Sequence, residues 1–137
     1  MKNSDVFNIV AFEVFHRCSD SFPIPAELST NEIAQDVFGY FDMSDNESIL
    51  AEQVDKVFDV VNYATDWLIT EGFLQDRGSS DDGFVVTFTL QGLNAVNKTP
   101  HSIEAQSSFK DVFINGLAGM PFATAAGLMV ELFKGGN

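Results

Sequence analysis

Basic residues and cysteine are scarce in this sequence of 137 residues. Lysine and arginine together number 7, against 20 aspartates and glutamates, which gives a formal net charge of −13. Because affinity for nucleic acid depends largely on neutralising phosphates, this balance argues against an ordinary nucleic-acid-binding surface. It suits a well-solvated surface, a basic protein partner or mimicry of nucleic acid. The one cysteine, Cys18, excludes an internal disulfide and is typical of a reducing compartment.

Motifs for catalysis, cofactor binding and metal binding are missing as well. His16 and Cys18 are two residues apart on an expected helix and therefore point in different directions. Residues 42–46 resemble the start of a calcium loop, but Glu47 stands where the loop needs glycine and Gln53 where it needs glutamate. The sequence has no glycine-rich phosphate loop and no nucleophile elbow. We therefore expect no enzyme activity, no cofactor and no metal.

The first residues show no signal-peptide pattern. Asp5, Glu13 and Arg17 interrupt any apolar stretch, and no small-residue cleavage site follows. Together with the single cysteine, this predicts a cytoplasmic protein.

Apolar residues are plentiful and include 14 phenylalanines, against two tyrosines and one tryptophan. Hydrophobic residues make up 45% of the chain, as expected of a folded globule. The length allows one domain with a hydrophobic core and an appendage. We expect a mainly α-helical α+β fold with a small β-hairpin. The domain covers residues 1–98, a linker covers residues 99–108, and an apolar helical tail covers residues 109–137.

The first expected helix covers about residues 5–19 and follows a cap at Ser4. Ile9 and Phe12 lie opposite its main apolar face, which is formed by Phe7, Val10, Ala11, Val14, Phe15 and Cys18. A helix at the surface has a single apolar stripe, so this helix is expected to be buried on two sides. Another part of the chain must then cover Ile9 and Phe12.

Two capping boxes predict the next two helices. The first, at residues 29–32, follows an extended segment with two prolines and opens a short helix that stops near Gly39. The second, at residues 44–47, opens the longest helix, which runs to about residue 71 with Gly72 after it. The sequence leaves open whether residues 45–71 form one helix or two, with a break near Asn62.

The long helix has an apolar face, widened by Ile49, Val60 and Trp67, and an acidic stripe opposite it, in which Lys56 is the only cation. A hairpin follows, with strands at residues 73–76 and 84–90 and a flexible turn at residues 78–83. Phe84, Val86, Phe88 and Leu90 share one strand face, which must pack on the helices because an isolated hairpin is only marginally stable. The stripe and the turn supply the candidate partner-binding residues: Glu52, Asp55, Asp59, Tyr63, Asp66, Asp81 and Asp82.

Three short segments carry a resemblance to a known family: Trp67-Leu68, Glu-Gly-Phe-Leu at residues 71–74, and Leu-Gln-Gly-Leu at residues 90–93. With the order helix, short helix, long helix and hairpin, they resemble a winged-helix domain of bacterial regulators over about residues 5–97. In DNA-binding members the long helix enters the major groove and the hairpin tip contacts phosphates. Those positions are acidic here, so phosphates would be repelled. The resemblance then implies a protein-interaction module, with DNA binding through another surface as the alternative.

The tail contains no charged residue between Val112 and Val130 and is flanked by Lys110 and Lys134. Its length approaches the roughly 20 residues that cross a bilayer, but several glycines and Pro121 interrupt it. Three interpretations are open. The tail forms one or two helices, broken near Pro121, that pack on the domain or on a second copy; residues 109–133 associate with a membrane; or a partner captures the segment.

Gly119, Ala123 and Gly127 stand four residues apart and form a ridge of small residues that allows close approach of another backbone. Together with Phe122 and Val130, they are the candidate residues for docking or oligomerisation. We therefore expect a non-enzymatic acidic module that binds a basic protein partner and forms homo-oligomers through its tail.

Overall fold

The computed structural model describes residues 1–101 and 107–134 and confirms the mainly α-helical α+β fold. Part of the expected linker, residues 102–106, and the end of the tail, residues 135–137, lie outside the described residues. The elements are α1 (Asn3–Ser21), β1 (Ala26–Ser29), α2 (Thr30–Phe38), α3 (Glu47–Thr70), β2 (Leu74–Ser80), β3 (Gly83–Phe88), α4 (Leu90–Val96), α5 (Phe109–Asn115) and α6 (Phe122–Lys134).

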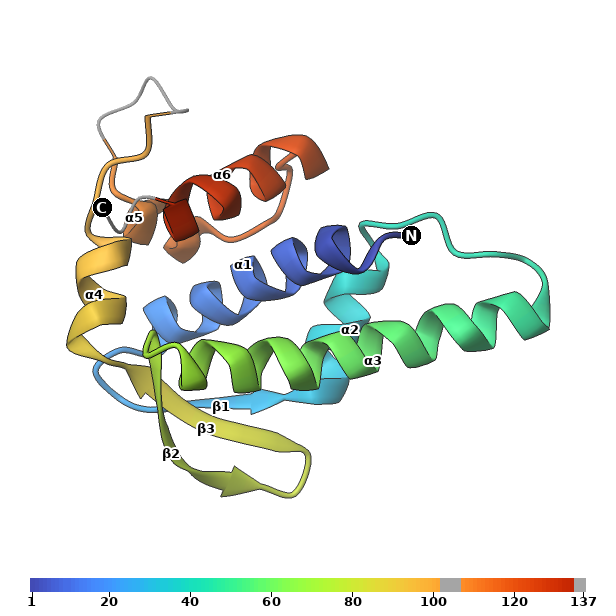
Figure 1. Ribbon diagram of the computed structural model, residues 1–137, viewed down its shortest axis with the longest axis horizontal. Coiled ribbons are helices and arrows are strands. Elements are labelled where there is room, and N and C mark those ends of the chain that lie inside the picture. The colour runs from blue at the N-terminus through green and yellow to red at the C-terminus, as the bar shows by residue number, and fades with distance from the viewer. Residues whose placement is uncertain (102–106, 135–137) are drawn as a thin grey trace.

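Helix α1 lies at the centre, with α3 on one side and α6 on the other (Figure 1), and it also contacts α2 and α5. Ile9 and Phe12 are both fully buried. The ring of Phe12 lies 4.9 Å from that of Phe113 in α5, measured between centroids. The predicted burial on two sides is confirmed, and the tail supplies the cover that the sequence required.

The predicted cap of α1 is wrong, whereas that of α2 is confirmed. Helix α1 begins at Asn3, so Ser4 lies within it, and the cap position is held by Lys2 without a side-chain hydrogen bond. At α2, the hydroxyl oxygen of Ser29 accepts a hydrogen bond from the backbone N–H of Glu32 at 3.2 Å. This bond satisfies one of the free N–H groups at the start of the helix.

Helix α3 is a single helix of 24 residues, so residues 47–70 have no break near Asn62. The cap prediction is off by two residues, because Asn46 and not Ser44 caps the helix. The side-chain oxygen of Asn46 accepts from the backbone N–H groups of Ser48 and Ile49, at 3.0 and 3.1 Å. These two bonds satisfy two of the free N–H groups at the start of the helix.

Strand β1, which the sequence did not predict, pairs antiparallel with β3 in a sheet of order β1-β3-β2. Ser29 stands opposite Gly83 at the end of this pairing. A Cβ atom on Gly83 would lie 1.9 Å from the carbonyl oxygen of Leu28, so the close pairing requires glycine. Residues 26–29 alternate between apolar and polar, but a run of four residues after two prolines is too short to predict a strand by itself.

The hairpin is longer and its turn tighter than predicted. Strand β2 continues to Ser80 through a bulge between Asp76 and Gly78, which leaves Asp81 and Asp82 at the tip. Val86 and Phe88 face the core as expected. Leu90 does not share their face: it is the first residue of α4 and 74% exposed, because the strand ends before the helix cap at Thr89.

The tail forms two helices, α5 and α6, which are separated by a turn that includes Pro121 and which both pack on α1. Phe109, Phe113, Leu128 and Met129 are buried in this contact. The tail is thus part of the hydrophobic core and not a separate appendage. No helix within residues 1–101 and 107–134 is long and apolar enough to cross a membrane.

Candidate functional site

The α3 stripe, as we call Glu52, Asp55, Asp59 and Asp66, lies on the outer side of α3, and all four residues are exposed. Lys56 is the one cation of this helix, and its Nζ donates to the carbonyl oxygen of Met1 at 3.1 Å. The ion pairs of Arg17 neutralise carboxylates on α1 and α2, away from this helix. The stripe is therefore a negatively charged surface about 20 Å long, judged from the helical rise over residues 52–66.

The tip of the hairpin carries the other two predicted acidic residues, Asp81 and Asp82, which are both exposed. The Asp82 carboxylate accepts a hydrogen bond from the Ser29 hydroxyl. The backbone carbonyl oxygen of Asp82 accepts one from the backbone N–H of Thr30 at 2.8 Å. The Thr30 hydroxyl in turn donates to the Asn62 side chain on α3 at 3.0 Å. Asp82 thus fixes the tip against the start of α2, which is itself bonded to α3.

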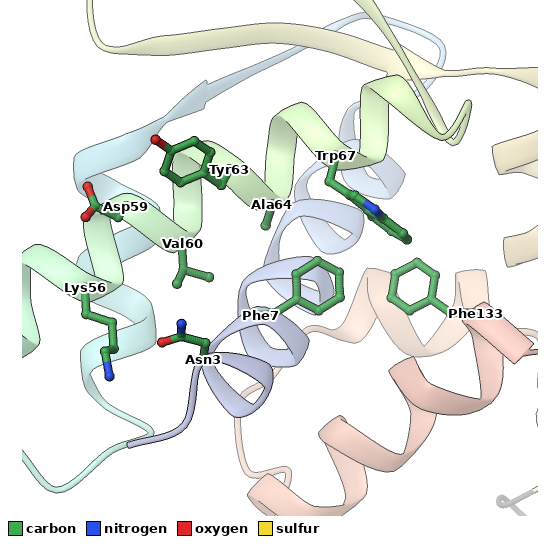
Figure 2. A pocket seen from close by; sticks show the side chains of 9 residues that line it. All are labelled: Asn3, Phe7, Lys56, Asp59, Val60, Tyr63, Ala64, Trp67 and Phe133. Carbon is green, nitrogen blue, oxygen red and sulfur yellow. The ribbon is translucent and has the colours of Figure 1, made fainter.

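A groove of about 800 Å³ opens beside the α3 stripe, between α3 and α1 (Figure 2). Helix α3 forms one wall, and α1 and the last turn of α6 form the other. We call it the α1–α3 groove; it is lined by Asn3, Phe7, Lys56, Asp59, Val60, Tyr63, Ala64, Trp67 and Phe133. Asp59 belongs to both the groove and the stripe, so apolar and acidic surfaces meet without a gap.

Three aromatic rings close one end of the groove, where Phe7, Trp67 and Phe133 contact one another (Figure 2). Their centroids lie 5.5 Å apart for Phe7–Trp67, 5.7 Å for Phe7–Phe133 and 5.5 Å for Trp67–Phe133. Trp67 nevertheless remains 40% exposed, and Tyr63 is 75% exposed. Exposed tryptophan and tyrosine beside a groove are the residue types that dominate binding energy at protein interfaces.

A second polar cluster lies between α1 and α2 around Arg17. The guanidinium contacts Glu13 at 3.0 Å, Asp36 at 2.8 Å and Glu32 at 3.7 Å. Glu13 is only 6% exposed, and burial raises the pKa of its carboxyl even though the bond from Arg17 acts in the opposite direction. The carboxylates of this cluster are therefore engaged with Arg17.

Two side chains beside this cluster, those of His16 and Tyr40, bond to α5 and to the turn that follows it. His16 donates from Nδ1 to the carbonyl oxygen of Phe113, and the Tyr40 hydroxyl donates to that of Leu117. Burial, together with the nearby Glu13 carboxylate, raises the pKa of Tyr40. A pocket of about 310 Å³ lies among these residues. The bonds of His16 and Tyr40 to the tail indicate that these two side chains help to hold the tail on α1.

Cys18 is buried in α1, and burial raises the pKa of its thiol to about 12. A thiol with so high a pKa is a poor nucleophile at neutral pH. Within the described part of the chain, no three His, Cys, Asp or Glu side chains are grouped so that they could hold a metal ion.

The predicted ridge of small residues is only partly helical. Gly119 lies in the turn before α6 with φ at +76°, so the prediction that it continues the helical ridge is wrong. Ala123, Gly127 and Val130 do lie on the exposed face of α6. Phe122 points elsewhere, toward Phe41, with 5.7 Å between the ring centroids.

Comparisons with known proteins give no match among family models, curated proteins or solved structures. A proposal for function therefore depends on the α3 stripe and on the α1–α3 groove. The sequence indicated the stripe and three groove residues, Val60, Tyr63 and Trp67. It could not indicate Phe7 and Phe133, which reach the groove from opposite ends of the chain.

Proposed function

We propose that this protein is a non-enzymatic interaction module and that its α3 stripe binds a basic surface of a partner protein. The observation that carries the proposal is the run of four exposed carboxylates on one side of α3, with Lys56 bonded to the chain start. Opposite charge on a partner would guide association and set its orientation. The proposal also includes a cytoplasmic location, because a single cysteine is typical of a protein in a reducing compartment.

A winged-helix-like scaffold is also part of the proposal. It is supported by the order of α1, the short α2, the long α3 and the β2–β3 hairpin, which is the order on which the resemblance was based. In the DNA-binding members of that family, the long helix enters the major groove and the hairpin tip contacts phosphates. Here the helix would bring Asp55, Asp59 and Asp66 close to the phosphates that border the groove, so a basic protein suits this surface better than DNA does.

Partner capture from a native lysate tests the proposal, with the Asp55→Asn, Asp59→Asn, Asp66→Asn variant beside the wild type. A matched control carries Asp20→Asn, Glu27→Gln and Asp42→Asn, which change the charge equally at exposed positions outside α3. We expect the stripe variant to lose the partner, the control to retain it, and both to keep the circular dichroism spectrum of the wild type. Equal capture by both variants would refute the proposal, and a low-salt mobility shift with duplex DNA would favour DNA binding instead.

A further inference from the structure

We propose that the α1–α3 groove binds a basic amphipathic helix of the partner protein. The apolar side chains of that helix contact Val60, Tyr63 and Trp67, and its lysines or arginines face the α3 stripe. This inference rests on the proposed function and adds to it a second contact surface and the shape of the ligand.

The spacing of residues on α3 is that of a helix-to-helix seam. Six residues of α3 line the groove, and four of them, Lys56, Val60, Tyr63 and Trp67, stand 4, 3 and 4 residues apart. These are the intervals between the a and d positions of a heptad, at which one helix contacts another. Beside them a carboxylate recurs every 7 residues, at Glu52, Asp59 and Asp66. In heptad notation these are g positions, which pair with opposite charges on the partner helix.

The length of the groove also fits a helix. From Lys56 to Trp67 the axis of α3 rises about 16 Å, which is about three turns. A helical ligand of about 11 residues would span this distance and present three or four apolar side chains at the i, i+3, i+4 and i+7 positions. The exposed rings of Tyr63 and Trp67 are placed to contact them, and the open volume of about 800 Å³ gives them room.

The charges around the groove select among possible occupants. Lys56 is the one cation among the groove residues, whereas Asp59 lines the groove and three more carboxylates of the α3 stripe lie beside it, so the anionic head group of a fatty acid would meet net repulsion. A second copy of the chain laid on the same face would bring two acidic stripes together, which is also repulsive. A helix with one apolar face and basic flanks satisfies both surfaces.

Trp67 is the only tryptophan of the chain and therefore reports directly on the groove. The test uses a tryptophan-free, dye-labelled synthetic peptide of about two heptads with leucine at a and d and lysine at e and g. We expect saturable binding, a blue shift of the Trp67 emission and a gain of peptide helicity. Two control peptides separate the contributions: one carries glutamate in place of lysine, and one has the same composition in an order without an apolar face. Neither should bind.

Three protein variants assign the contacts. Val60→Gln places a polar group on the groove wall, and Trp67→Ala removes an anchor; each should weaken binding of the labelled peptide about tenfold or more. The Glu52→Gln, Asp59→Asn, Asp66→Asn variant should weaken it by a similar factor. The control variant with Asp20→Asn, Glu27→Gln and Asp42→Asn should bind like the wild type. Circular dichroism and thermal unfolding verify that each variant is folded, and Val60→Gln avoids the aromatic cluster should Trp67→Ala unfold the protein.

The outcomes separate the two proposals. The groove proposal is wrong, and the proposed function stands, if the peptide without an apolar face binds equally well. The same holds if the Trp67 emission does not change while the Glu52→Gln, Asp59→Asn, Asp66→Asn variant loses binding of the peptide. If neutral Nile red occupies the groove and the basic peptide does not displace it, the groove takes a small apolar ligand and the groove proposal is again wrong. If no basic peptide binds and the Asp55→Asn, Asp59→Asn, Asp66→Asn variant still captures partners from lysate, both proposals fail.

Discussion

Helices α1 and α3 pack against each other, but they use their apolar residues differently. In α1, ten of 19 residues are buried, and they point to all sides of the helix. In α3, five of 24 residues are buried, from Val57 to Leu68, and the helix packs on α1, α2 and β2. Of the other apolar residues of α3, Phe58 and Ile69 pack partly on the core, whereas Tyr63 and Trp67 are exposed and line the groove.

The difference shows that two helices of one core can have separate tasks. Helix α1 is enclosed by α2, α3, α5 and α6 and supplies stability. Helix α3 gives one side to that core and leaves an acidic and aromatic side available for binding. Substitutions should therefore act on folding in α1 and on binding in the outer side of α3. The four predictions below test this division.

The largest expected effect concerns the reactivity of Cys18 in α1. Because burial raises the pKa of its thiol to about 12 from an ordinary 9.0, the thiolate population at pH 8 falls by about a thousandfold. Alkylation by iodoacetamide should be slower than in denaturant by at least that factor. In a Cys18→Ala background, a Tyr63→Cys thiol on the outer side of α3 should react at the rate of a free thiol. Similar rates for the two thiols in the native protein would contradict the division.

Removing a buried ring of α1 should lower the free energy of unfolding far more than removing an exposed ring of α3. Phe12→Ala removes a fully buried ring that contacts Phe113 and should lower the free energy of unfolding by about 3–5 kcal/mol. Tyr63→Ala removes a ring that is 75% exposed and should change it by at most about 0.5 kcal/mol. Urea denaturation measures both. A cost above about 2 kcal/mol for Tyr63→Ala would show that this side of α3 supports the fold.

The sequence predicts the enclosure of α1 because apolar residues on two sides of a helix require two partners. Ile9 and Phe12 showed the need for a cover, and the tail, apolar and almost without charge, was an available one. The long helix and its acidic stripe follow from a local periodicity that any single helix displays. These features depend on residues close together in the chain.

The features that were missed depend on long-range contacts. Strand β1 needs Gly83, which lets β3 approach Leu28, and an alternation of only four residues does not by itself predict a strand. The groove needs Phe7 and Phe133 beside Trp67, and no local pattern relates the two ends of the chain. Leu90 matched the strand alternation, but the Thr89 cap starts a helix there. Local signals therefore gave the helices, while tertiary contacts decided the groove.

The division between inner and outer sides should also hold within α6, where two neighbouring residues differ in burial. Leu128 is 1% exposed and packs in the core, so Leu128→Ala should lower the free energy of unfolding by about 2–5 kcal/mol. Gly127 is exposed, and a Cβ atom there would meet nothing within 4 Å. Gly127→Ala should therefore raise the free energy of unfolding by up to about 1 kcal/mol. If Gly127→Ala instead lowers the free energy of unfolding, the outer face of α6 must be in contact with another surface. Sedimentation velocity would show whether that surface belongs to a second copy of the protein.

The smallest effect is expected at Glu13, the buried carboxylate of α1. Burial raises its pKa above the ordinary 4.5, against the opposing effect of Arg17. Between pH 4.5 and the raised value, the native state binds more protons than the unfolded state, so this group makes the free energy of unfolding fall as the pH rises. Glu13→Gln removes the titration but keeps an oxygen that accepts from Arg17.

The free energy of unfolding of Glu13→Gln, relative to wild type, should therefore increase as the pH is raised from 4.5. Urea denaturation of both proteins at several pH values between about 4 and 8 measures this difference, in which the titration of carboxylates that do not interact with Glu13 cancels. A difference that stays constant would mean that Arg17 fully offsets the burial of Glu13. A difference that decreases would mean that the ion pair outweighs burial, and that even the enclosed helix gains stability from charge.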